Sequence, residues 1–210
     1  MIAKDGPACP RCDAGLRAPS IWASGWHCHE HGEVSPLWPT LSPSRAGLAG
    51  LLRGAAVPVW LPWPLPHGWV VTGFAGAGDD CTGTRACAVA LSGPSPAGGV
   101  AELLLVSEDP RVGLGCRFAG LDGLDPGLHL TAGPPATAVR FGGHELPLWR
   151  VQAPGRAAFA GELMGTWLWL VLWPAAAVAL LATPLRVRDL RDPGQQLDLP
   201  FGAPSPQLPR

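Results

Sequence analysis

The feature that most constrains the fold is a run of twenty residues without a charged side chain, residues 163–182 (LMGTWLWLVLWPAAAVALLA). A helix of this length and polarity could cross a lipid bilayer. The alternation within the run favours a strand instead, because three of its tryptophans and Val171 would share one face and three leucines the other. A strand that is apolar on both faces is typical of the middle of a sheet. Pro174 can end this strand and begin a helix over the alanines that follow.

We therefore expect a buried strand in a soluble protein, and a membrane-spanning helix over 163–182 is the alternative. Arginines flank the run on both sides, so the distribution of positive charge would not strongly favour either orientation of a spanning helix. The segment Met1–Arg11 lacks the apolar core of a signal peptide. Six cysteines without a secretion signal indicate a reducing compartment, where paired thiols bind metal more often than they form disulfides. This combination predicts a cytoplasmic location.

The rest of the chain predicts short strands separated by glycine, proline and aspartate turns. Gly142 and Gly143 fit a hairpin turn, and Ser44 can cap a helix over residues 45–53. The expected strands are residues 69–75, 85–92, 101–107, 137–141, 146–151, 156–160 and 185–190.

Alternate prolines at positions 62, 64 and 66 force an extended path on residues 57–69. We expect this segment to be an edge strand or clamp that lays its three tryptophans on the core. A polyproline ligand for a partner domain is the alternative.

These patterns predict an α+β fold dominated by β-structure, in which a small N-terminal zinc ribbon precedes a mainly antiparallel sheet domain with one or two short helices. The expected parts are a zinc ribbon over residues 1–35, a linker over 36–44, a tryptophan-rich β domain over 45–192 and a disordered tail over 193–210.

Within the expected ribbon, two pairs of metal-ligand residues have the same spacing. Cys9 and Cys12 form a C-x2-C pair, and after fifteen residues Cys28 and His31 form a C-x2-H pair. Two residues between ligands allow a tight turn to direct both side chains at one ion. Two such turns joined by a short hairpin give the four tetrahedral ligands of a closed structural zinc site. The sequence therefore predicts one structural Zn²⁺ bound by these four residues.

His29 competes with His31 for the fourth position. We favour His31 because it keeps the spacing of the first pair, whereas His27 and His29 flank Cys28 and should point away from it. A closed site of three cysteines and one histidine has no open coordination position, so it indicates scaffolding and not metal catalysis.

The charge of the chain argues against nucleic-acid binding. The formal net charge is −1, and residues 1–34 contain three basic side chains against four acidic ones. A nucleic-acid interface gathers Lys and Arg on one face to neutralise phosphates.

No local motif predicts a catalytic site. Cys87 lies in an apolar run and Cys81 in a loop, and neither has a histidine or lysine nearby in sequence to activate it. The acidic residues next to glycine or proline are typical of turns, and His144 follows a Gly-Gly turn. An enzyme with a site assembled from Asp79, Asp80 and His144 in a tryptophan-lined pocket is an alternative to be tested.

Eight sequence blocks carry a resemblance that covers nearly the whole chain: CPRC, CHEHGEV, VPVWLPWPLPHGWVVTGFA, ALSGP, AELLLVSEDP, GLDGLDPG, WLWLVLWP and DLRD. With them the chain resembles an uncharacterised bacterial family from GC-rich genomes, a domain of unknown function. The resemblance implies zinc pairs at Cys9, Cys12, Cys28 and His31, and a soluble protein. Asp13 departs from the pattern, because ribbon turns commonly place glycine there.

The resemblance supplies no activity. The expected function is therefore that of a non-enzymatic cytoplasmic protein whose zinc ribbon docks a protein partner, while the β domain holds an unknown ligand or a second partner.

Overall fold

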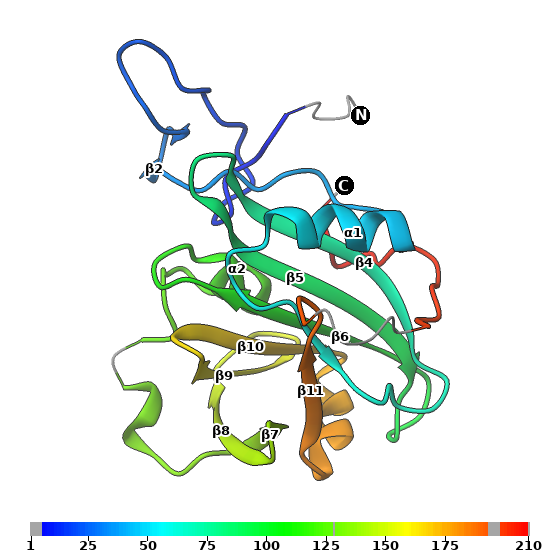
Figure 1. Ribbon diagram of the computed structural model, residues 1–210. Coiled ribbons are helices and arrows are strands. Elements are labelled where there is room, and N and C mark those ends of the chain that lie inside the picture. Colours follow the sequence, from blue (N-terminus) through cyan, green and yellow to red (C-terminus); the bar gives the residue numbers. More distant parts are fainter. Residues whose placement is uncertain (1–5, 128, 193–197, 210) are drawn as a thin grey trace.

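The computed structural model describes residues 6–127, 129–192 and 198–209. A curled nine-stranded sheet dominates it, and a two-stranded antiparallel sheet lies near the N-terminus (Figure 1). The large sheet contains β3 (Trp60–Pro62), β4 (Val70–Asp79), β5 (Gly83–Pro94), β6 (Val100–Glu108), β7 (Thr137–Phe141), β8 (His144–Val151), β9 (Ala157–Leu163), β10 (Thr166–Trp173) and β11 (Leu185–Asp189). The small sheet contains β1 (His27–Cys28) and β2 (Gly32–Glu33). The helices are α1 (Arg45–Gly54) and α2 (Leu114–Ala119), with 3-10 helices η1 (Leu130–Ala132) and η2 (Ala175–Ala182).

The large sheet has the order β3-β11-β7-β8-β9-β10-β6-β5-β4. Two antiparallel meanders, β4 to β6 and β7 to β10, join where β10 pairs with β6. Only β11 and β7 pair in parallel among the described strands. The prediction of a β-dominated α+β fold with a mainly antiparallel sheet is confirmed.

β10 is the central buried strand that the uncharged run predicts. Leu168, Leu170 and Leu172 pack into the hydrophobic core on one face of the sheet, and Trp169 and Val171 into the core on the other. The strand ends at the predicted proline, and η2 follows. None of the helices formed by the described residues is both long enough and apolar enough to span a bilayer.

The two α-helices lie on opposite faces of the sheet. Ser44 begins α1 by accepting a 3.0 Å hydrogen bond from the backbone N–H of Gly47, as the sequence predicts. Leu51 of α1 then packs with Phe74 into one core cluster, while Phe118 of α2 packs into the other. Both faces of the sheet centre are therefore covered, which accounts for the burial of its strands on both sides.

The proline-rich segment forms the edge strand that was predicted. β3 lies at one end of the sheet and pairs with β11. Trp60 is buried there, with its ring edge-on to Phe141 at a centroid distance of 4.8 Å. The segment thus anchors aromatic side chains in the core, which favours the structural interpretation over a polyproline ligand.

Residues 198–209 return to the sheet, although a disordered tail was predicted for 193–210. Phe201 makes a parallel bridge with Val71, and Leu208 is buried in the core. Ser205 donates a 2.6 Å hydrogen bond to the Glu102 carboxylate. Widely spaced apolar side chains therefore order this polar, proline-rich segment. Residues 193–197 lie outside the described part of the chain.

Candidate metal centre

The N-terminal module, residues 6–35, projects from the sheet as a long hairpin followed by β1 and β2 (Figure 1). The predicted hairpin is paired through Arg17 and His27, which exchange two backbone hydrogen bonds of 3.0 Å. This pairing brings the segment before the hairpin next to the segment after it. The two predicted ligand pairs therefore lie side by side.

Four potential metal-binding atoms converge at the base of this hairpin. The Sγ atoms of Cys9, Cys12 and Cys28 and a ring nitrogen of His31 all lie within 4.8 Å of one another. His31 Nδ1 is 3.5 Å from the Cys9 sulfur and 3.6 Å from the Cys28 sulfur, and the Cys12 and Cys28 sulfurs are 3.7 Å apart. The cluster could hold one metal ion.

The two turns that present these ligands have the same local geometry. In the first turn the Cys9 sulfur accepts hydrogen bonds from the backbone N–H groups of Arg11 and Cys12. In the second turn the Cys28 sulfur accepts them from Glu30 and His31, the equivalent positions. Each turn therefore offers a thiolate a pair of oriented dipoles, which favours the charged form that binds metal.

The environments of the two buried sulfurs nevertheless differ. Burial dominates at Cys9 and raises the pKa of its thiol to about 11, against the opposing backbone N–H groups. At Cys28 burial also raises the pKa, but the backbone N–H groups and His31 outweigh it and bring the pKa to about 6. Without a metal, the Cys28 thiol thus ionises at a lower pH than the Cys9 thiol.

The first turn also docks on the body of the protein. Asp13 has a left-handed backbone with φ of 64°, the conformation for which ribbon turns commonly use glycine. Its carboxylate lies 2.9 Å from the guanidinium of Arg117 on α2. Arg117 in turn donates a hydrogen bond to the carbonyl of Cys9. Asp13, which stands where ribbon turns commonly place glycine, therefore connects the cluster to the sheet domain.

His31, and not His29, takes part in the cluster. His29 is exposed, and the Nδ1 atom of His27 lies 3.2 Å from the carbonyl of Gly25. The alternating direction of side chains around Cys28 accounts for this outcome, because both neighbours of a buried residue point away from it.

Nearly the whole chain matches one protein family. Residues 3–208 match the family described as "Family of unknown function (DUF6758)". The chain belongs to the DUF6758 family. No curated protein and no solved structure matches it. The resemblance to a family of unknown function is confirmed, while the bacterial origin and the GC-rich genomes of that family remain predictions.

The other candidate residues of this DUF6758 chain do not assemble into a site. Asp79 and Asp80 lie at the β4–β5 turn and His144 at the β7–β8 turn, and four strands separate β4 from β8 in the sheet. Asp79 accepts hydrogen bonds from the backbone of Cys81 and Thr82, as a turn residue does. The alternative site built from these three residues is therefore not formed.

The remaining cysteines of the DUF6758 chain are separate from the cluster. Cys87 and Cys116 are buried, and burial raises the pKa of each thiol to about 12. Thiols of this kind are inert packing groups at neutral pH. Cys81 is exposed, as expected for a loop.

Sequence reasoning did not single out Glu108 as a buried residue. This residue ends β6 and is fully buried. Its carboxylate accepts hydrogen bonds from the backbone N–H groups of Leu114 (2.7 Å) and Gly115 (3.2 Å) and from Trp169 Nε1 (2.8 Å). The period of two along β6 could have revealed it, because Glu108 shares a face with the buried Leu104 and Val106.

Proposed function

We propose that this chain is a non-enzymatic cytoplasmic zinc protein in which the metal stabilises a docking module for a protein partner. The observation that carries the proposal is the spacing of the four ligand atoms. With Zn–S bonds of about 2.3 Å and Zn–N bonds of about 2.0 Å, tetrahedral zinc separates two sulfurs by about 3.8 Å and a sulfur from a nitrogen by about 3.5 Å. The distances of 3.7, 3.5 and 3.6 Å in the cluster match these values.

A structural role for the ion fits the rest of the module. Three cysteines and one histidine complete a tetrahedron and leave no position for a substrate. Around the cluster the module buries little apolar surface: Val34 is buried beside two of the cysteines, with Ala14 and Leu16 partly buried against them. So small a core needs a metal ion to hold its shape.

Metal analysis tests this part of the proposal. We expect the purified full-length protein to contain one equivalent of zinc. Cys12→Ser should lose the metal, and the matched control Cys81→Ser, which removes an exposed thiol elsewhere, should retain it. An unsubstituted protein without stoichiometric zinc, or equal metal contents in the two variants, would refute the site.

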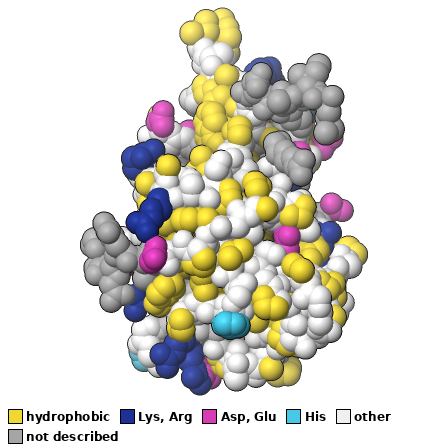
Figure 2. All heavy atoms as spheres, turned by 90° about the vertical axis from the view of Figure 1, so that its right-hand side faces the viewer, with side chains coloured by type: hydrophobic (Ala, Val, Ile, Leu, Met, Phe, Trp, Pro, Cys, Tyr) yellow, Lys and Arg dark blue, Asp and Glu magenta, His cyan; other side chains and the backbone are white. Residues whose placement is uncertain are grey.

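The tip of the hairpin supplies the docking surface. Ile21 and Trp22 are 90% and 89% exposed, at a turn closed by hydrogen bonds between Ser20 and Ala23. Figure 2 shows a narrow projection with hydrophobic side chains at the top of the molecule. An exposed tryptophan beside an isoleucine leaves apolar surface in contact with water, which is unfavourable in the free protein. Such a pair is a typical anchor of a protein interface.

The matched pair Trp22→Ser and Val100→Ser tests docking, because Val100 is also exposed but lies on β6. Quantitative affinity purification should lose the same partner with Trp22→Ser and with Cys28→Ser, and keep it with Val100→Ser. Identical partners for all variants would contradict the proposal.

Cell fractionation tests the cytoplasmic location. Detergent-free lysis should leave the protein in the supernatant, and recovery only from the membrane pellet would contradict the cytoplasmic assignment.

A further inference from the structure

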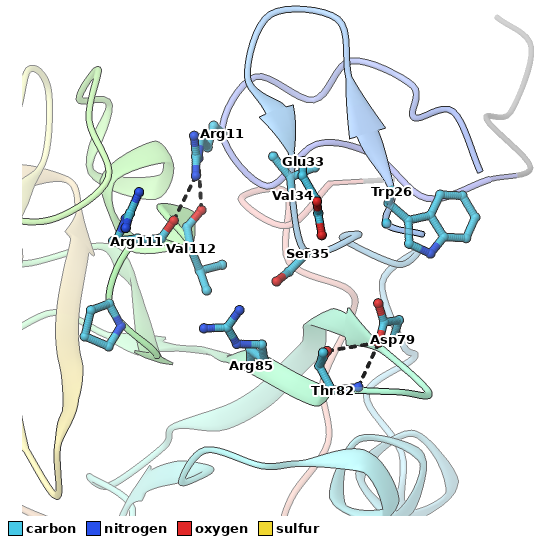
Figure 3. Close-up of a pocket in the computed structure, with 12 residues that line it drawn as sticks. Arg11, Trp26, Glu33, Val34, Ser35, Asp79, Thr82, Arg85, Arg111 and Val112 are labelled. Atoms are coloured by element: carbon cyan, nitrogen blue, oxygen red, sulfur yellow. Dashed lines mark hydrogen bonds between the residues drawn. The ribbon is translucent and has the colours of Figure 1, made fainter. Parts of the chain in front are cut away.

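A cavity of about 330 Å³ lies between the N-terminal module and the large sheet. Three parts of the chain line it: the module, the β4–β5 turn and the loop between β6 and α2. Figure 3 shows these three parts around a common space, with the guanidinium of Arg85 projecting into it. The volume is that of a small-molecule site at the lower end of the usual range.

Three guanidinium groups gather on one side of this cavity: Arg11, Arg85 and Arg111 (Figure 3). Like charges at such a site repel one another unless acceptors or anions compensate them. The balance of donors and acceptors around each arginine therefore decides what the cavity can bind.

The protein compensates these arginines only in part. Arg11 donates to two neutral acceptors, the carbonyls of Arg111 (2.9 Å) and Val112 (3.3 Å). Arg85 uses its Nε for a 3.0 Å ion pair with Asp109. The guanidinium of Arg111 has no hydrogen-bond partner among the described residues. Since each guanidinium carries five N–H donors, unused donors remain on Arg85 and Arg111.

The acidic side chains of the cavity fill this deficit only in part, because the charge of Asp79 attracts that of Arg85 without forming an ion pair with it. Asp79 is occupied by its own turn, where it accepts hydrogen bonds from the backbone N–H groups of Cys81 and Thr82 and from the Thr82 hydroxyl. Figure 3 places Glu33 on the side of the cavity away from Arg111. Neither carboxylate forms an ion pair with an arginine within the described part of the chain.

The backbone also holds Arg111 in an unusual conformation. Its φ of 74° is left-handed, which is uncommon for a residue other than glycine. The Asp125 carboxylate fixes it by accepting a 2.9 Å hydrogen bond from the Arg111 N–H. Such outliers concentrate at ligand sites, where the surrounding contacts maintain the strain.

We propose that this cavity binds the oxyanion group of a small molecule, a carboxylate or a phosphate, through Arg85 and Arg111. Arg11 positions the loop that carries Arg111. Glu33 and Asp79 repel a second anionic group on the opposite side, so the cavity selects a small, singly headed anion over a polyanion. The site is distinct from the metal cluster and from the hairpin tip.

Titration of the zinc-loaded full-length protein, followed by amide NMR shifts, tests the proposal with two probes. Inorganic phosphate represents the phosphoryl ligand and acetate the carboxylate ligand, against chloride at matched ionic strength. At least one probe should give saturable shifts at residues 33–35, 82–85 and 110–112. The probe that saturates identifies the ligand class. Shifts no larger than those with chloride for both probes would overturn the proposal.

Variants then assign the binding to the named side chains. Arg111→Gln should lower the affinity for the saturating probe about tenfold. This is the factor expected from the loss of a hydrogen bond to a charged group. Arg150→Gln, which makes the same charge change on β8, should leave affinity unchanged. Glu33→Gln removes a repelling carboxylate without touching a donor and should tighten binding about twofold. Equal weakening by the two arginine variants, or weaker binding by Glu33→Gln, would refute the assignment.

Discussion

The indole N–H of Trp169 donates a 2.8 Å hydrogen bond to the buried carboxylate of Glu108. The same carboxylate accepts hydrogen bonds from the first two backbone N–H groups of α2, those of Leu114 and Gly115. One acidic side chain thus connects the central strand β10, the end of β6 and the start of α2. Because the loop before α2 carries Arg111 and Val112, this buried contact also positions one side of the cavity.

The packing at this contact predicts that Gly115→Ala destabilises the protein. A Cβ atom at Gly115 would lie 2.2 Å from the Trp169 indole, so the helix or the buried ring must move. We expect a loss of about 2 kcal/mol in the free energy of unfolding, measured by urea denaturation. Gly133→Ala is the control, because open space surrounds that position. Equal stability of the two variants would show that α2 is not held against Trp169.

The buried carboxylate predicts a pH dependence of stability. Burial raises the pKa of Glu108 from 4.5 to about 7, against the three hydrogen bonds that stabilise its charged form. Since the folded state binds the proton more tightly than the unfolded state, this contribution is complete below about pH 4.5 and is lost as the pH rises through about 7. The loss is up to about 3 kcal/mol.

Urea unfolding at several pH values between 5 and 8 measures this effect against Glu108→Gln, whose amide does not titrate. The stability of the unsubstituted protein should fall with rising pH relative to the variant. A constant difference across this range would mean that the carboxylate titrates normally.

The two neighbouring histidines provide a matched test of the ligand set. His31→Ala should weaken zinc binding by more than about a hundredfold, since even the residues that orient a ligand change metal affinity by 10–100-fold. His29→Ala should keep one equivalent of zinc, because His29 is exposed and outside the cluster. Competition with a chromogenic chelator measures both affinities. Loss of zinc from the His29 variant alone would reassign the fourth ligand.

Arg11 joins the first ligand turn to the loop before α2, which predicts the effect of Arg11→Met. Without its hydrogen bonds to the carbonyls of Arg111 and Val112, the loop should open more often. We expect amide hydrogen exchange at Val112 to accelerate about tenfold while zinc content is unchanged. Arg17→Met is the control, because Arg17 is exposed in the same module. Unchanged exchange, or equal acceleration by the control, would contradict the coupling.

Local pattern sufficed to predict the central strand, the first helix and the hairpin of the module. In each case neighbours in sequence decide the structure: alternating Leu and Trp in β10, Ser44 before α1, and equal ligand spacing on either side of the hairpin. β4, however, continues beyond the predicted residue 75 through a glycine-rich stretch that reads as a loop. There Gly76 lets Leu51 of α1 and Thr84 approach the backbone closely, a contact that sequence pattern does not reveal.

The features that were not predicted depend on residues far apart in the chain. The buried carboxylate of Glu108 accepts a hydrogen bond from Trp169, which lies on a strand of the other meander. The cavity combines Arg11, Arg85 and Arg111, which no motif connects. Residues 198–209 are ordered only by what they cover, as the bridge from Phe201 to Val71 illustrates. Such contacts follow from strand order, and the order of nine strands is not encoded in the period of any one of them.

β3 and β4 follow one another along the chain but form opposite edges of the large sheet. Pro62 of β3 pairs with Val187 of β11, so the first strand of the large sheet stays without this partner until the chain has been synthesised beyond residue 187. Between the synthesis of β3 and that of β11, the nascent polypeptide therefore presents an unpaired segment that carries Trp60. We expect chaperones that bind apolar segments to shield this one until β11 is available to pair with it.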